Sequence, residues 1–203
     1  AEDMNDFAMK ELLIDCGFPL TFDDAVMKEA HSLSENITRQ ELIKRKDCRD
    51  ILTFTIDPND AKDFDDAISV RNLDNGNYEI GVHIADVSHF VTPGSLLDKV
   101  AYERATSVYL PDRVNPMLPE KISNELCSLR PHEDKYTFSA IFQINNRAEI
   151  KHSWLGRTVI HSNHRFTYDE VQEIIEKKDG LHYKPIMLLN DLAQKFRRER
   201  FRK

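Results

Sequence analysis

The chain has 203 residues, of which 40% are apolar and 31% charged, and its 28 basic and 35 acidic side chains give a formal net charge of −7. This balance is typical of a globular protein and excludes the fibrous and disordered classes. The net acidity excludes a nucleic-acid binder that is basic on all sides. It leaves open a basic channel, or an acidic site that reaches nucleic acid through metal ions.

Neither end of the chain nor its cysteines point to a membrane or an oxidising compartment. No apolar run approaches the roughly 20 residues needed to cross a bilayer, and the acidic N-terminus lacks the apolar segment of a secretory signal. Cys16, Cys48 and Cys127 are far apart and form no pair with zinc spacing. We therefore expect a cytoplasmic protein without disulfides, structural zinc or a membrane partner. Because the chain does not begin with Met, we also expect it to be a piece of a longer protein.

The first 50 residues predict helices. A helix over about 7–16 would end at Gly17-Phe-Pro19. Two candidate capping boxes follow, Thr21-Phe-Asp-Asp24 and Thr38-Arg-Gln-Glu41. We interpret residues 1–45 as a helical lead-in segment.

From residue 51 the pattern becomes that of strands. Residues 51–56, 67–71 and 78–84 are β-rich, and Asp74-Asn-Gly76 predicts the turn of a hairpin. A second strand pair is predicted over 136–145, where polar and apolar residues alternate, and 149–162. Further elements are expected as follows: helices over 95–106, 119–128, 167–180 and 185–203, and a short strand over 107–110. The predicted class is α+β, with a mixed, mainly antiparallel sheet flanked by helices, and residues 46–203 forming a single domain.

The most informative segment is the acidic loop that follows the first predicted strand. It contains five carboxylates within ten residues: Asp57, Asp60, Asp63, Asp65 and Asp66. Like charges crowded in this way raise one another's pKa values or require a cation. Aspartate is also the short oxygen ligand that Mg²⁺ and Ca²⁺ prefer. A solvated, Asp-rich turn is the plain alternative, but strands on both sides and Phe64 inside the loop favour a fixed geometry.

A calcium loop of the EF-hand type is excluded in both possible registers. Counting from Asp57, the positions that require Gly and Glu hold Lys62 and Ile68, and counting from Asp63 the Gly position holds Ile68. What remains is a carboxylate cluster that could hold one or two Mg²⁺. Two such ions ~3.5–4 Å apart can activate a water and stabilise the leaving oxygen in phosphodiester cleavage.

The same residues carry a resemblance to a known family. The segment Ile56-Asp57-x5-Asp63-Phe-Asp65-Asp66-Ala67 resembles the acidic signature of the ribonuclease II/ribonuclease R family, the RNB domain. Three further stretches match in order: His83 to Val91, Ala105 to Pro111, and Pro116 to Pro119 with Leu126 to Leu129. Lys62-Asp63-Phe-Asp65-Asp66 and the Thr-Ser-Val-Tyr run make the likeness closer to bacterial ribonuclease R.

The resemblance implies a partial RNB fold and a processive, hydrolytic 3′→5′ exoribonuclease that releases 5′-nucleoside monophosphates. It implies that Asp57, Asp63, Asp65 and Asp66 are catalytic carboxylates holding one or two Mg²⁺, with Mn²⁺ a possible substitute, and that Asp65 matters most to the chemistry. Tyr109 falls on the family's aromatic that stacks on a base near the 3′ end. The implied partner is single-stranded RNA with a free 3′ end, without an organic cofactor.

Other residues are weaker candidates. Without the resemblance, Tyr109 could equally be a core tyrosine at a strand end. His83 and His89 are expected to be structural or RNA-contacting, and Asp86 either a turn residue or a group that orients the acidic loop. Cys127 is expected to be a buried apolar residue, not a nucleophile. The basic C-terminal run is expected to be a solvated helix face.

Two function classes stay open. The first is the N-terminal part of an Mg²⁺-dependent exoribonuclease domain, inactive without the remainder of its parent chain, which by resemblance carries an essential arginine and a second aromatic. The second is a non-catalytic RNA-binding or scaffold module that kept half of the fold. Four mutually repelling aspartates favour the first, because a scaffold has no need of them.

Overall fold

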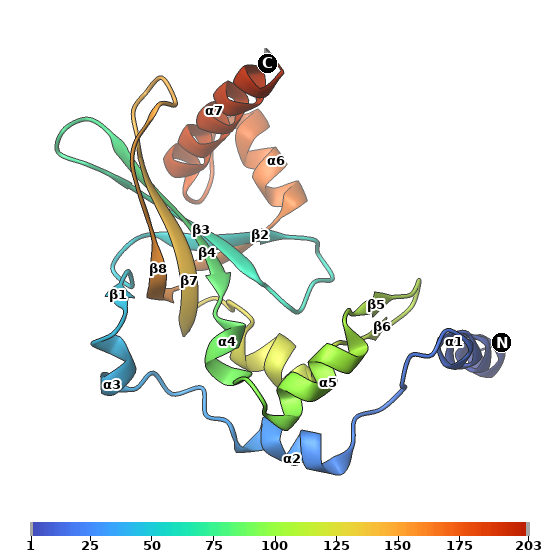
Figure 1. Cartoon of the computed structure of the whole chain (residues 1–203). Helices are drawn as coiled ribbons and strands as arrows, with labels where there is room; N and C mark the ends of the chain where they lie inside the picture. Colours follow the sequence, from blue (N-terminus) through green and yellow to red (C-terminus); the bar gives the residue numbers. More distant parts are fainter. Residues whose placement is uncertain (1, 202–203) are drawn as a thin grey trace. The chain divides into compact units, whose positions relative to one another are not determined.

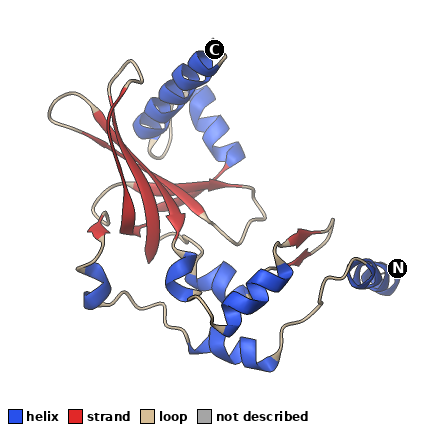
Figure 2. Cartoon of the chain, viewed as in Figure 1, coloured by secondary structure: helices blue, strands red, loops and turns tan. Residues whose placement is uncertain are grey.

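The computed structural model describes residues 2–201, which form two compact units. The first consists of the residues up to Glu35 together with Val87–Leu126, and the second of Asn36–Asp86 together with Cys127 onward. Figure 2 shows that most strands belong to the second unit and that the first is mainly helical. Helices combined with a mainly antiparallel mixed sheet confirm the predicted α+β class. In the described residues, no helix has the length and apolar character to cross a membrane.

The second unit is built on a seven-stranded sheet in the order β1-β8-β7-β4-β3-β2-β9 (Figure 1). The antiparallel centre is formed by β2, β3, β4, β7 and β8, and the edge pairs β1–β8 and β2–β9 are parallel. The strands are β1 (Lys46–Asp47), β2 (Thr53–Asp57), β3 (Asp66–Asn72), β4 (Tyr78–Ala85), β7 (Asp134–Ile144), β8 (Ile150–His161) and β9 (His164–Thr167). The sheet thus joins segments more than 100 residues apart.

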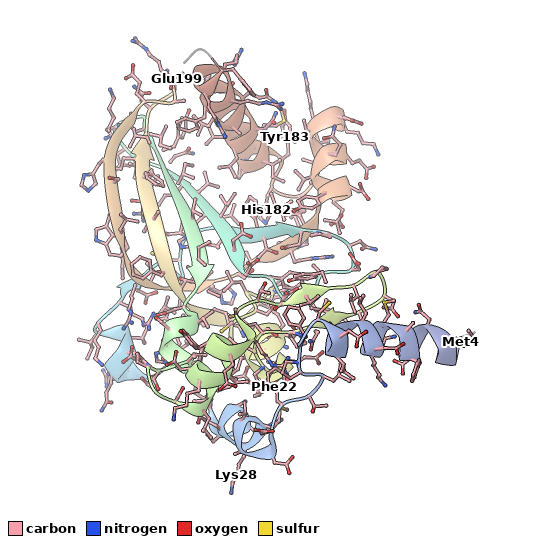
Figure 3. The ribbon with its side chains drawn as sticks, turned by 45° about the vertical axis from the view of Figure 1, so that its right-hand side comes forward. Met4, Phe22, Lys28, His182, Tyr183 and Glu199 are labelled. Carbon is pink, nitrogen blue, oxygen red and sulfur yellow. The ribbon has the colours of Figure 1, made fainter. Side chains whose placement is uncertain are left out.

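Two helices, α6 (Tyr168–Lys177) and α7 (Tyr183–Arg200), cover one face of this sheet (Figure 1). The core beneath them contains Phe54 and Phe166, whose rings meet edge to face at 5.4 Å. His182, labelled in Figure 3, lies just before α7 and stacks on Phe54 at 6.3 Å. Thr167 and Glu170 complete the predicted capping box at the start of α6. Burial of this apolar face is the main source of stability for the helices.

The opposite face of the sheet is polar and yet buried. His83 is fully buried and bonds Ser139 through Nδ1 at 2.6 Å and Ser69 through Nε2 at 2.8 Å. Ser139 in turn bonds the Thr158 hydroxyl, which also pairs with Thr137. Burial lowers the pKa of His83 to about 4, so the ring is neutral at physiological pH. These hydroxyl and imidazole groups satisfy one another, which is why the sheet can bury them.

The alternation of polar and apolar residues in β7 does not separate an exposed face from a buried one, because both faces are buried along much of the strand. Thr137 and Ser139 are buried, whereas Phe138 is 48% exposed. Phe138 pairs with Ile84 on β4, and Leu155 on β8 pairs with Ala140 beside it. Ile84 and Leu155 are exposed as well, so this end of the sheet presents an apolar surface.

The described part of the first unit contains five helical segments and a two-stranded ribbon. They are α1 (Glu2–Asp15), α2 (Asp24–Ser32), α4 (Val87–Phe90), α5 (Leu96–Arg104), β5 (Val108–Tyr109), β6 (Val114–Asn115) and the π-helix η1 (Lys121–Leu126). The predicted cap of α5 is confirmed, since Ser95 accepts from the Asp98 N–H. Glu29 on α2 accepts from the Leu96 and Leu97 N–H groups at 3.1 and 3.3 Å.

Several expectations about local structure are wrong. Asp23, not Thr21, is the N-cap of α2, and it makes no side-chain cap bond. Thr38 does cap a helix, but α3 (Arg39–Leu42) is a single turn. His89, whose alternation with apolar residues after His83 predicts an extension of that strand, lies in α4 instead. The division into compact units, which groups the described residues up to Glu35 with Val87–Leu126, does not test the predicted boundary near residue 45. That boundary stays a prediction.

Candidate functional site

The acidic loop connects β2 to β3 at one end of the sheet. Asp57 is the last residue of β2 and Asp66 the first of β3, and residues 58–65 between them have no regular secondary structure. Thr53, Thr55 and Asp57 share one face of β2, since side chains alternate along a strand. The strands therefore fix both ends of the loop, as the sequence predicted.

Asp57 is the most buried of the four aspartates. Its residue is only 7% exposed, and its Oδ2 atom is buried without a hydrogen-bond partner among the described residues. Burial raises the pKa of Asp57, and repulsion from Asp66 and Asp65 adds to the effect. The Thr55 hydroxyl and the Arg165 guanidinium oppose this rise. A carboxylate in this position is destabilised unless it gains a proton or a cation.

Asp65 and Asp66 share this electrostatic neighbourhood, whereas Asp63 is less involved. Although Asp66 as a residue is exposed, burial around its carboxyl group raises its pKa, and repulsion from Asp65 contributes. Asp63 is exposed and is not among the charges that shift Asp57 or Asp66. The structure thus brings Asp57, Asp65 and Asp66 into mutual repulsion and leaves Asp63 and Asp60 exposed in the loop.

Two side chains distant in sequence hold this loop in place. The Ser128 hydroxyl donates to the Lys62 carbonyl at 3.0 Å and accepts from the Phe64 N–H at 3.1 Å. Arg165 on β9 donates to the carbonyls of Pro58 and Asn59. Sequence reasoning missed both, because their roles depend on pairings across roughly 65 and 107 residues that no local pattern reveals.

Tyr109 lies at the end of β5, in the other compact unit, and is 71% exposed. This exposure does not fit a core tyrosine. It leaves the aromatic ring accessible to solvent.

The remaining candidates are structural. His83 belongs to the buried hydroxyl network. Asp86 is buried at the end of β4 and pairs with the fully buried guanidinium of Arg45 at 2.8 Å. Burial raises the pKa of Cys127 to about 12, which excludes an activated thiolate at neutral pH. All three cysteines are free.

The donor set suits a hard divalent cation. Within residues 2–201, no three His, Cys, Asp or Glu side chains already converge as they would around a bound metal ion. The fit rests on chemistry: aspartate oxygens alone, a buried oxygen without a partner, and pKa values raised by like charges. A divalent cation would give the buried oxygen a partner and would reduce the repulsion between the carboxylates.

Comparison with known proteins identifies the class. The RNB domain family matches residues 45–203, and the chain belongs to this family. It is 50% identical over 157 residues to ribonuclease R of Chlamydia trachomatis, an alignment that covers 77% of this chain and 23% of that protein. The chain therefore spans about a quarter of that relative.

Solved structures agree with the fold. Mycoplasma genitalium RNase R in complex with ribose-methylated single-stranded RNA superposes with a TM-score of 0.87 at 32% identity, covering 95% of this chain and 31% of that one. Yeast Ssd1, described as a pseudonuclease, superposes with a TM-score of 0.70 at 25% identity, covering 79% of this chain and 20% of that one. The fold thus occurs both in a ribonuclease and in a protein described as a pseudonuclease.

Proposed function

We propose that this chain supplies the carboxylate site of an Mg²⁺-dependent 3′→5′ exoribonuclease, which hydrolyses single-stranded RNA from a free 3′ end and releases 5′-nucleoside monophosphates. Asp57 carries this proposal: it is buried, one carboxylate oxygen has no hydrogen-bond partner in the described chain, and Asp65 and Asp66 repel it. Membership of the RNB family and the likeness to ribonuclease R support the substrate class. The proposed compartment is the cytoplasm.

In this proposal Asp57, Asp63, Asp65 and Asp66 would hold one or two Mg²⁺, with Mn²⁺ a possible substitute. When bound, the metal supplies a Lewis acid and an activated water. Asp57 is held by β2 and Asp66 by β3, so the strands set the separation of these two ligands. Asp65 is further fixed by its carbonyl, which accepts from the Ala85 N–H at 3.0 Å.

Tyr109 is proposed to position the RNA end. Its exposed ring can stack on a base of any identity, an interaction worth roughly 1–3 kcal/mol. Stacking of this kind suits an enzyme that degrades RNA without sequence preference.

Asp65→Asn in the full-length protein tests the proposal. Removing one carboxylate charge should abolish RNA hydrolysis and leave RNA binding largely unchanged, as measured by product release and by fluorescence anisotropy with 3′-tailed RNA. The matched control is Asp74→Asn, an exposed aspartate in the β3–β4 turn, which should behave as wild type. Wild-type turnover by Asp65→Asn would contradict the assignment.

A non-catalytic RNA-binding or scaffold module is the second candidate. It is favoured by the likeness to yeast Ssd1 and by the absence of a converged ligand set in residues 2–201. RNA binding by the full-length protein without hydrolysis in Mg²⁺ or Mn²⁺ would favour this function.

For the 203-residue chain alone we expect no exoribonuclease activity, because positioning and electrostatic stabilisation supply most of the rate in such chemistry. Incubation with Mg²⁺ and 3′-tailed RNA, with Asp65→Asn to exclude contaminating nucleases, measures this. Release of mononucleotides at an enzyme-like rate would contradict the expectation.

A further inference from the structure

The acidic loop has two anchors that differ in kind. Ser128 and the Leu129 N–H hold its second half through the backbone of Lys62 and Phe64. The first half, residues 58–61, carries no strand pairing. Its described hydrogen bonds to the rest of the fold come from one side chain, that of Arg165.

The register between β9 and β2 places Arg165 beside the loop. β9 runs parallel to β2, with Arg165 opposite Thr55 and Thr167 opposite Asp57. Since paired residues project to the same face, Arg165 lies on the face that carries Asp57. Its Nη2 atom donates to the Pro58 carbonyl at 2.5 Å and to the Asn59 carbonyl at 3.0 Å.

The same guanidinium also reaches the second half of the loop. Its central carbon lies 5.4 Å from the centre of the Phe64 ring, within the range of a cation–π contact. One planar group therefore contacts the carbonyls of residues 58–59 and the ring of residue 64, and so links the two halves of the loop. A lysine ammonium, being a compact point charge, cannot reproduce this planar contact set.

Arg165 binds the backbone of the loop and not its carboxylates. Among the described residues it makes no ion pair within 4.0 Å of an Asp or Glu, whereas Arg45 in the same unit pairs with Asp86. Its charge still acts at longer range, since it lowers the pKa of Asp57. The aspartate oxygens thus stay available for a cation, while Arg165 holds the backbone of the loop.

We propose that Arg165 is a positioning residue that fixes residues 58–64 so that the carboxylates on either side can face one divalent cation. The proposal deepens the proposed function and rests on it for the cation. The hold on the loop can be measured without any metal.

Hydrogen exchange followed by mass spectrometry, in a chelating buffer, tests the hold directly on the 203-residue chain. Arg165→Met keeps the aliphatic stem and removes the donors, and should speed exchange over residues 58–66 by about tenfold while leaving β7–β8 unchanged. Arg165→Lys keeps the charge and should show most of the same increase. The control, Arg147→Met, changes an exposed arginine in the β7–β8 turn and should match wild type. If Arg165→Met does not fold, the exchange rate of residues 58–66 in Arg165→Lys tests the proposal.

Mn²⁺ binding, measured by electron paramagnetic resonance, tests the link to the cation. Arg165→Met and Arg165→Lys should both bind about tenfold or more weakly than wild type, as expected when a residue that orients metal ligands is lost. Three results would each overturn the proposal. The first is unchanged hydrogen exchange over residues 58–66 in Arg165→Met, and the second is unchanged Mn²⁺ affinity despite faster exchange. The third is wild-type behaviour of Arg165→Lys in both assays. A wild-type chain that binds no Mn²⁺ would contradict the proposed function instead, and hydrogen exchange would then decide whether Arg165 holds the loop.

Discussion

Ser128→Ala should weaken the fold and loosen the acidic loop together. The residue is 1% exposed, and its hydroxyl serves both the Lys62 carbonyl and the Phe64 N–H. Alanine removes both partners and leaves an N–H and a carbonyl without their hydrogen bonds. A group left unsatisfied when buried costs about 1–3 kcal/mol. Since these two are only partly buried, we expect the free energy of unfolding to fall by about 2 kcal/mol in total.

Urea unfolding at pH 7 measures this free energy, with Ser32→Ala as the control. The Ser32 hydroxyl also donates to a backbone carbonyl, that of Glu29, but it is exposed, so its loss should stay within about 0.5 kcal/mol. Hydrogen exchange should rise over residues 62–65 in Ser128→Ala only. A loss for Ser128→Ala no larger than the control's would refute the reasoning that this hydroxyl holds the loop.

Three further predictions concern other parts of the chain. The raised pKa of Asp57 means that the native state binds its proton more tightly than the unfolded state, so its contribution to stability is lost as pH rises from the ordinary Asp range through the raised value. In a chelating buffer, the free energy of unfolding of Asp57→Asn minus that of wild type should therefore be larger at pH 7 than at pH 3.5. A difference between the two proteins that does not change with pH would contradict this. Tyr109→Ala should change the length of the final undegraded oligonucleotide and Tyr109→Phe should not; identical product ladders would count against stacking. Gly81→Ala would place a methyl group 2.4 Å from Ser69 Oγ and 2.5 Å from His83 Nε2, so we expect a loss of about 2–4 kcal/mol in thermal or urea unfolding.

Much of the fold could be predicted from local signals. The β3–β4 hairpin follows from its Asp-Asn-Gly turn, where Gly76 takes a φ of +77°, and the capping box at Thr167 and Glu170 marks the start of α6. Such features depend on residues within a few positions of one another, so the sequence displays them directly.

Features that depend on distant pairing could not be predicted. β9 is four residues long and exists because β2 lies beside it, so nothing around Arg165 indicates its contact with the acidic loop. Burial of the polar face of β7 could not be predicted for the same reason. Thr137 and Ser139 look like surface residues until His83 and Thr158 supply their hydrogen bonds.

The acidic loop could be recognised from the spacing of its aspartates, but its electrostatics could not. Burial, the largest cause of the raised pKa of Asp57, is a property of the folded chain. The sequence therefore indicated which groups are crowded, and the fold determined that Asp57 is the most buried of them.

The carboxylate of Glu29, which accepts from the first N–H groups of α5, has a consequence for where the chain can be cut. These groups are separated by 67 residues of sequence, and the strands β1 to β4 lie between them. A shortened chain that begins at residue 45, where the family match begins, would keep α5 and its Ser95 cap but lose α2 and with it the two hydrogen bonds from Glu29. Sequence similarity thus marks what relatives share, whereas the contacts of α5 extend to a helix that lies before the matched residues.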